Sequence, residues 1–262
     1  MVRSAFSHLE LDVSSPAQLI LSVAVAGADN SDTLTVTQNG APLAIREVTD
    51  QHSTRLHLVD AQAGRVIVDY TVRFEGDLPA AEIDELDELR YIRPSRYCES
   101  DTLGPTARNQ FQGLTGRDLL AAVSSWVGSQ LFYVPGSSAP TDGAVATMLA
   151  RQGVCRDYAH LVVALLRALD VPARLVSVYA PGLYPMDFHA VAEAFIDGDW
   201  YVVDATTLAP RQTLMRIATG RDASDTAFLS TRGGAVSIHK MEVGAVVDEL
   251  PRDDVNLMVK LA

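Results

Sequence analysis

The spacing of apolar residues changes from a period of two to a period of about 3.6 near residue 90, and this change limits the possible folds most. Residues 7 to about 75 contain four β-rich segments: Leu19–Ala26, Leu34–Thr37, Arg55–Val59 and Val66–Phe74. In the last one, every second residue is apolar or aromatic, which is the pattern of a half-buried strand. Asn39-Gly40 is a hairpin signal between two of them. We therefore expect a small antiparallel β-sandwich.

The second half of the chain has the periodicity of amphipathic helices. Helices are predicted over Thr115–Ser129, Asp142–Arg151 and Cys155–Leu169. Later strands are expected at Arg174–Ala180, His189–Ile196 and Trp200–Ala205, and near Thr226–Ser230 and Ala235–Val247. The fold class predicted is α+β, with a β-sandwich over residues 1–76, a connector over 77–93 and a second domain over 94–262.

Charge and composition exclude some partners. Of 262 residues, 48% are hydrophobic and 21% charged, which is an ordinary globular composition with enough apolar material for a core. The net charge is −12, and acidic residues cluster in Glu75–Glu88. Such a surface repels phosphate backbones, so no nucleic-acid partner is expected. The acidic run itself is typical of a solvated helix face or linker.

The number of cysteines and the length of the apolar segments indicate where in the cell the protein is expected. Cys98 and Cys155 are the two cysteines of the chain, too few for a disulfide framework. The first residues contain no apolar signal-peptide region, and runs such as Leu161–Leu166 are too short to cross a bilayer. We therefore expect a cytoplasmic protein with no membrane partner.

Cys155 stands at the start of an apolar helical run, directly after Gly153-Val154. A lone cysteine is usually a small buried apolar residue. At a helix N-terminus, however, free backbone N–H groups stabilise a thiolate, so thiols placed there are more reactive. The backbone N–H of Cys155 is also well placed to donate to an oxyanion.

His189 and Asp204 are predicted to meet across a hairpin that turns at Asp197-Gly198. With a two-residue turn, paired residues have numbers that add up to 395, so Asp204 faces position 191 and His189 is its diagonal neighbour on the same face. A four-residue turn also keeps both on one face, whereas a three-residue turn reverses every side chain. Alone, Asp204 could simply cap the loop that follows it. Together, the pair can orient an imidazole toward a thiol.

Several stretches carry a resemblance to a known family. They are Gly153–His160, Val171–Arg174, Phe188–Ala190, Asp197–Trp200, Val203–Thr206 and Arg216–Asp222. Together they resemble the transglutaminase-like superfamily of papain-like cysteine enzymes, over roughly residues 91 to 230. The N-terminal half resembles the β-rich domain that often precedes the catalytic domain in bacterial members.

The resemblance implies a transglutaminase-like catalytic domain with Cys155 as nucleophile, His189 as base and Asp204 as the residue that orients it. Two departures matter. The family commonly has His-Ala-Trp, whereas this chain has Val191 in place of the tryptophan. A substrate-binding role of the tryptophan ring is therefore not expected in this chain. No acidic cluster has calcium-loop spacing, so we expect no metal and no cofactor.

Other candidate residues carry weaker signals. Asp157 complements the helix dipole and could pair with Arg156 or Arg174. His160 follows Cys155 by five residues and is interpreted as packing, and Cys98 is a poor nucleophile beside acidic residues. The candidates for a second oxyanion donor are Gln110, Gln152 and Trp126.

The sequence thus predicts a cysteine-dependent amide hydrolase (a peptidase or amidase) that forms a thioester at Cys155. One alternative is a protein-glutamine acyltransferase that uses the same three residues. Another is a binding or assembly module that keeps the fold without catalysis. The substrate is expected to be a peptide or another amide, and neither its identity nor the oligomeric state can be predicted.

Overall fold

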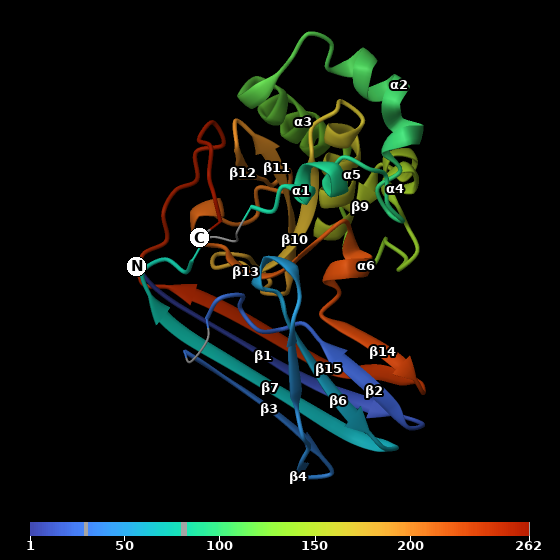
Figure 1. Cartoon of the computed structure of the whole chain (residues 1–262), viewed down its shortest axis with the longest axis vertical. Helices are drawn as coiled ribbons and strands as arrows, with labels where there is room; N and C mark the ends of the chain where they lie inside the picture. Colours follow the sequence, from blue (N-terminus) through green and yellow to red (C-terminus); the bar gives the residue numbers. More distant parts are fainter. Residues whose placement is uncertain (29–30, 80–82, 262) are drawn as a thin grey trace.

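The computed structural model describes residues 1–28, 31–79 and 83–261. A β-sandwich forms the lower part in Figure 1, and an α/β part lies above it. Residues 80–82 of the predicted connector, which include Glu82 of the acidic run, and residue 262 lie outside the described residues.

The sandwich consists of two antiparallel sheets (Figure 1). The first sheet has the order β15-β1-β7-β3-β4, with bounds Val236–Val247, Val2–Val13, Gly64–Glu75, Asp32–Gln38 and Ala41–Pro42. The second has the order β14-β2-β6-β5, with bounds Leu229–Gly233, Ala17–Leu21, Arg55–Ala61 and Arg46–Thr49. Buried and more exposed residues alternate along β7 and β1, because one face of each strand packs into the core. The predicted antiparallel sandwich is confirmed.

Strands from both ends of the chain build this sandwich. β15 pairs with β1, and β14 pairs with β2. The predicted division at residues 76 and 94 stays a prediction about domains, but the sheets also include residues 229–247. The strand expected over Leu19–Ala26 ends at Leu21, and the segment near Thr226 is a short helix, α6 (Ala223–Thr226), before β14 begins.

The α/β part is organised around α5 (Cys155–Arg167), in which every residue from Asp157 onward is buried. On one side α5 contacts α2 (Ser100–Gln110), α3 (Gly116–Gln130) and α4 (Ala144–Ala150). On the other side it contacts an antiparallel sheet of order β12-β11-β10-β13, with bounds Asp199–Val203, His189–Ile196, Ala173–Tyr179 and Met215–Gly220. This cover on both sides explains why even the charged residues Asp157 and Arg167 of α5 are buried.

The remaining elements are short. They are η1 (Gln51–Ser53), α1 (Leu86–Tyr91), β8 (Phe132–Tyr133), β9 (Gln152–Gly153) and η2 (Arg211–Thr213). Helix α2 was not among the predicted helices; it contains Pro105 and is much more polar than α3, so few apolar residues indicate a buried face.

A buried ion network joins three strands of the central sheet. Both carboxylate oxygens of Glu193 accept hydrogen bonds, one from Arg174 at 2.8 Å and one from Arg216 at 2.7 Å. The Arg174 guanidinium also lies 3.9 Å from the ring centroid of Trp200 and 3.6 Å from Asp87 in α1. The two arginines hold the pKa of Glu193 at about 2, although burial alone would raise it. Arg174 is therefore committed to this network, and not to Asp157.

Candidate active site

Cys155 is the first residue of α5, after Val154 in extended conformation. Its side chain is half-buried. Gly153 allows the chain to approach the helix closely, because a Cβ atom at this position would lie 2.7 Å from Cβ of Asp157. The thiol is thus held at the helix N-terminus, where backbone N–H groups point outward.

Asp157 stabilises this N-terminus. Its Oδ2 accepts a hydrogen bond from the Val154 N–H at 2.8 Å, and its Oδ1 pairs with Arg156 at 3.0 Å. Ser138 donates a further hydrogen bond to Oδ1. The carboxylate is fully buried and its charge is paired with Arg156, one of the two partners considered from the sequence.

The β11–β12 hairpin has the predicted register. Ala192 pairs with Val203 and Ile196 with Asp199, which is the two-residue turn. Asp197 and Gly198 both have positive φ, as a type I′ turn requires. His189 and Asp204 consequently lie on one face, and Nε2 of His189 is 3.1 Å from Oδ2 of Asp204.

Asp204 is held from both sides. Its Oδ1 accepts hydrogen bonds from the backbone N–H and the hydroxyl of Thr206, at 2.8 and 2.7 Å. Burial would raise the pKa of Asp204, but His189 and these hydrogen bonds lower it below the ordinary value. The carboxylate therefore stays ionised beside the imidazole.

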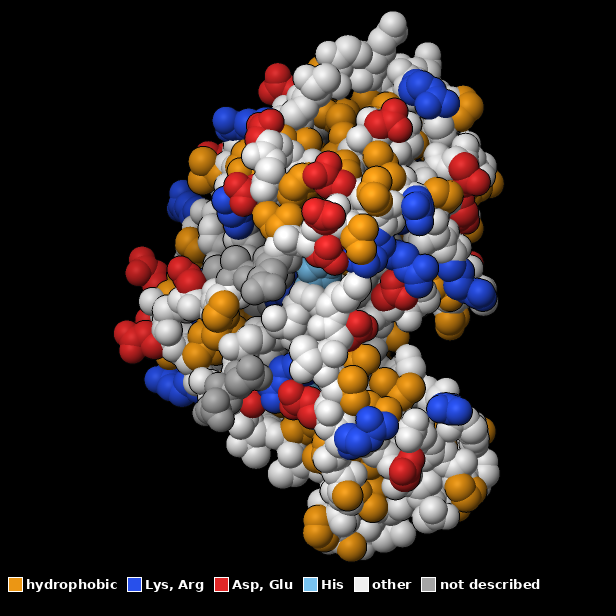
Figure 2. All heavy atoms as spheres, viewed as in Figure 1, with side chains coloured by type: hydrophobic (Ala, Val, Ile, Leu, Met, Phe, Trp, Pro, Cys, Tyr) orange, Lys and Arg blue, Asp and Glu red, His pale blue; other side chains and the backbone are white. Residues whose placement is uncertain are grey.

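The imidazole of His189 has a raised pKa and one nitrogen that Asp204 does not use. Burial would lower its pKa, but the charge and hydrogen bond of Asp204, together with the nearby Cys155 thiol, raise the pKa to about 10. The other ring nitrogen, Nδ1, forms no hydrogen bond to a nitrogen or oxygen atom of the described residues, which leaves it for the Cys155 thiol. His189 and Cys155 line the same cavity of about 470 Å³. In Figure 2 the surface is hollowed at the right edge, between the α/β part and the sandwich.

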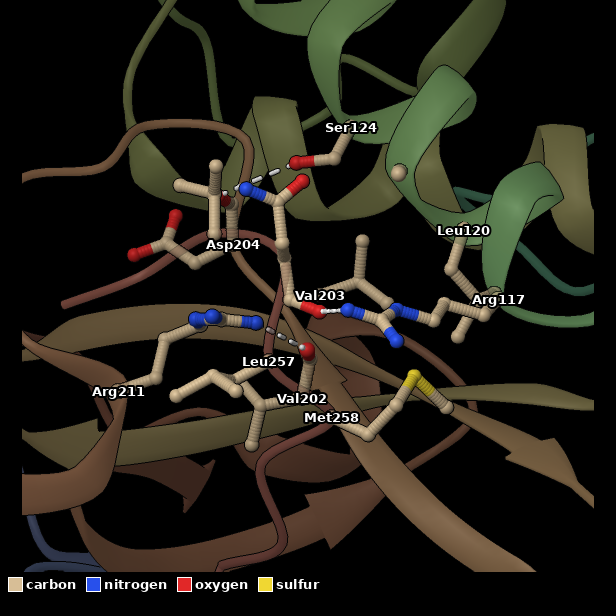
Figure 3. Close-up of a pocket in the computed structure, with 12 residues that line it drawn as sticks. Arg117, Leu120, Ser124, Val202, Val203, Asp204, Arg211, Leu257 and Met258 are labelled. Atoms are coloured by element: carbon tan, nitrogen blue, oxygen red, sulfur yellow. Dashed lines mark hydrogen bonds between the residues drawn. The ribbon is translucent and has the colours of Figure 1, made fainter.

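A second, much smaller cavity of about 40 Å³ lies behind Asp204 (Figure 3). The chain near Leu257 and Met258 covers it, and Arg211 donates a hydrogen bond to the Val202 carbonyl across its floor. Ser124 on α3 donates to the backbone carbonyl of Asp204. This space is too small for a substrate, so the residues around it support the hairpin from behind.

Tyr133 lies next to this site, on the wall of a neighbouring cavity, and was not predicted from the sequence. Strands β8 and β9 pair in parallel, which places Tyr133 opposite Gly153, two residues before Cys155. Burial and the charge of the Cys155 thiolate raise the pKa of the Tyr133 hydroxyl, whereas a hydrogen bond from the Cys155 backbone N–H lowers it. Both effects require the Tyr133 side chain to lie close to Cys155. A two-residue strand has no periodicity, so only the tertiary pairing reveals it.

The three predicted oxyanion donors lie elsewhere. Gln110 ends α2 and is exposed, and Gln152 is exposed on β9. Trp126 packs edge-on against Phe111. None of the three lines the cavity that contains Cys155.

His160 and Cys98 are packing residues. His160 stacks on Tyr97 and accepts a hydrogen bond from the Ala223 N–H at 3.1 Å, and burial lowers its pKa to about 4. Cys98 is fully buried, and burial raises its pKa to about 12. Both cysteines are free.

Within residues 1–28, 31–79 and 83–261, no group of three or more His, Cys, Asp or Glu side chains could hold a metal ion. In the same part of the chain, no helix combines the length and apolar character needed to cross a bilayer.

Comparison with known proteins gives a consistent family. Residues 106–205 match the family model described as the transglutaminase-like superfamily. The crystal structure of a "putative cysteine protease" from Cytophaga hutchinsonii is similar over 98% of this chain and 96% of that chain, with a TM-score of 0.88 and 32% sequence identity.

A curated relative is more distant. Uncharacterized protein ML0607 of Mycobacterium leprae (strain TN) is 27% identical over 161 residues. This match covers 57% of the present chain and 56% of the relative, so the chain spans little more than half the length of that protein.

Proposed function

The chain belongs to the transglutaminase-like superfamily, and from this premise we propose that it is a cysteine-dependent amide hydrolase with Cys155, His189 and Asp204 as its catalytic set. One observation carries the proposal. The imidazole of His189 is bonded to Asp204 through Nε2, while its Nδ1, which Asp204 does not use, belongs to a ring that shares a cavity with the Cys155 thiol. A thiol, a base and an orienting carboxylate in this order are the parts of a nucleophilic site.

The reaction would begin with attack of the Cys155 thiolate on the amide carbonyl carbon. The C–S bond forms, and the carbonyl oxygen becomes an oxyanion that accepts hydrogen bonds from the Cys155 N–H and the Tyr133 hydroxyl. The C–N bond then breaks as the His189 imidazolium gives its proton to the leaving amine. This leaves a thioester on Cys155 and a neutral imidazole.

Water would complete the cycle. Neutral His189 takes a proton from water, the hydroxide attacks the thioester, and the C–S bond breaks to release the acid and the thiolate. If a primary amine replaces water, the same thioester produces a new amide, which is the acyltransferase alternative. We favour water because it needs no binding group of its own, whereas an acceptor ammonium would depend on Asp187 at the cavity rim.

Labelling with iodoacetamide at neutral pH tests the nucleophile. We expect one adduct on the native protein, lost in Cys155→Ala and retained in the matched control Cys98→Ala, because Cys98 is buried. Persistent labelling of Cys98 in native Cys155→Ala would contradict the assignment. An inert Cys155 would favour the non-catalytic module.

Product analysis tests the reaction. Amide substrates incubated without and with a primary amine should release the free acid in both cases. If the acid forms only slowly and a new amide dominates when the amine is present, the protein is an acyltransferase. Both outcomes require Cys155.

The setting of the protein is part of the proposal. We propose a cytoplasmic protein that acts on a peptide or other amide and binds no nucleic acid, on the basis of its two free cysteines and its net charge of −12. Cell fractionation and a salt-dependent nucleic-acid binding assay test these two points.

A further inference from the structure

The β-sandwich forms one wall of the cavity in front of Cys155. Phe228 lines it directly before β14, Ser230 lines it from β14, and Met241 lines it from the middle of β15. The opposite wall is the central sheet, with Leu175 on β10 and Ile217 on β13. A substrate that fills this cavity would therefore touch both parts of the protein.

The walls are mainly apolar. Phe188, the residue before His189, stacks on Phe228 with ring centroids 4.9 Å apart and an angle of 20° between the planes. Leu175 and Ile217 are almost fully buried at the base, and Met241 is 36% exposed at the side. A concave, apolar space of about 470 Å³ beside a nucleophile has the size and character of a ligand site.

Two buried hydroxyl groups at the same cavity lack hydrogen-bond partners. Within the described ranges, eight buried side-chain polar atoms lack a hydrogen-bond partner. Two of them that lie outside the proposed catalytic set, Oγ of Ser22 and Oγ of Ser177, belong to residues that line this cavity. Native proteins leave few buried polar groups unpaired, and such groups are expected where a ligand completes the site.

One carboxylate, that of Asp187, lies at the rim of the cavity. Arg156 is paired with Asp157, whereas Asp187 forms no ion pair within the described part of the chain. The carboxylate of Asp187 accepts a hydrogen bond from the Phe188 N–H at 2.7 Å, and burial raises its pKa. An acidic side chain of the substrate would meet this carboxylate, so the rim disfavours it.

We infer that this cavity is the subsite for the acyl part of the substrate, and that it selects a large apolar side chain next to the scissile amide, with β14 and β15 as its outer wall. The inference rests on the proposed function in one respect, that Cys155 is the attacking atom. Discrimination by such a pocket is on the order of 10-fold or more between a large and an absent side chain.

Chloromethyl ketones test the subsite without requiring turnover. The Cys155 sulfur forms a bond to the reagent's methylene carbon, and chloride leaves. The rate at which this adduct forms, measured by intact mass, therefore reports how well the cavity binds the side chain of the reagent. The rate of each reagent is expressed relative to the rate of iodoacetamide on the same protein. On this scale we expect the N-acetyl-phenylalanyl reagent to react about 10-fold faster than the N-acetyl-glycyl reagent. Equal rates in the unmodified protein would overturn the inference.

Two residues on β15 provide a matched pair of variants. Met241 lines the cavity, whereas Ile238, on the same strand and 46% exposed, does not. Met241→Glu should abolish most of the preference for the phenylalanyl reagent, and Ile238→Glu should leave it unchanged. Met241→Ala and Ile238→Ala repeat the comparison without a new charge, in case the first pair folds poorly. The same preference in both members of a folded pair would refute the role of the sandwich wall.

Hydrolysis assays separate this inference from the proposed function. If no amide is hydrolysed but the reagent preference exists and depends on Met241, the subsite stands and the hydrolase proposal fails. If amides are hydrolysed at Cys155 without regard to the acyl side chain, the hydrolase proposal stands and the subsite is wrong.

Discussion

His189 presents Nε2, and not Nδ1, to Asp204, with the two bonded atoms 3.1 Å apart. When Nε2 carries the donated proton, Nδ1 of the neutral ring is an acceptor. The hairpin register thus determines which nitrogen is free to exchange a proton with the Cys155 thiol. This orientation has consequences for the pH dependence of the site.

Asp204→Asn should move the alkaline limit of activity to lower pH. The pKa of His189 is raised from 6.5 to about 10, so the ring holds the proton needed by the leaving amine below that pH and loses it above. Removing the carboxylate charge should shift the alkaline limb of kcat/KM down by about 1–3 pH units, the usual effect of a close opposite charge. A pH profile of initial rates measures this.

Asp199→Asn is the control for that experiment, because Asp199 lies on β12 and pairs with exposed Lys260. Its alkaline limb should coincide with that of the unmodified protein. An unchanged limb in Asp204→Asn would show that Asp204 does not control the protonation of His189.

Tyr133→Phe should lower kcat with little change in KM. The Tyr133 side chain lies close to Cys155, and the proposed mechanism uses its hydroxyl as a donor to the oxyanion. Loss of one such donor costs on the order of 10²-fold in kcat. Steady-state kinetics measure the effect. Tyr158→Phe is the matched control, since that hydroxyl donates to the Leu131 carbonyl and should affect stability more than rate.

Glu193→Gln should destabilise the fold by about 3 kcal/mol or more, because it leaves Arg174 and Arg216 buried without a full countercharge. The folded-state pKa of Glu193 is about 2, below its ordinary 4.5, so its contribution is complete above pH 4.5 and is lost as the pH falls toward 2. Urea unfolding at pH 7 and at pH 3 measures both effects.

Glu242→Gln provides the comparison for Glu193, since Glu242 pairs with Lys240 at the surface. Its effect should be below about 1 kcal/mol. Equal losses in the two variants would mean that the buried network contributes no more than a surface pair.

Gly153→Ala should weaken the N-terminus of α5. The new Cβ would lie 2.7 Å from Cβ of Asp157, so either the helix start or this carboxylate must shift, and the hydrogen bond to Val154 is lost. We expect slower alkylation of Cys155 and a lower melting temperature. Alkylation and thermal stability equal to those of the unmodified protein would show that the start of α5 tolerates the displacement.

Local rules were sufficient for the hairpin and for the start of α5. Asp197-Gly198 specifies a two-residue turn, and the pairing of Ala192 with Val203 follows from counting along the two strands. The same counting places His189 and Asp204 on one face. These relations depend on neighbours in sequence, so they can be read without coordinates.

Contacts between distant segments were beyond such rules. The pairing of β15 with β1, and of β14 with β2, joins residues more than 200 positions apart. The periodicity of apolar residues in a strand predicts which face of the strand is buried. It does not predict which other strand pairs with it. For the same reason, the position of Tyr133 beside Cys155 emerges only from the short pairing of β8 with β9.

By itself, the sequence determined the class of elements, the turn that aligns His189 with Asp204, and the helix start that holds Cys155. Only the tertiary structure decided that the sandwich closes around both ends of the chain, that its strands wall the cavity, and that Tyr133 lies close to Cys155. The physical reason is range: turn geometry and helix ends are set by interactions within a few residues, whereas the shape of a cavity is set by side chains that packing brings together from remote segments.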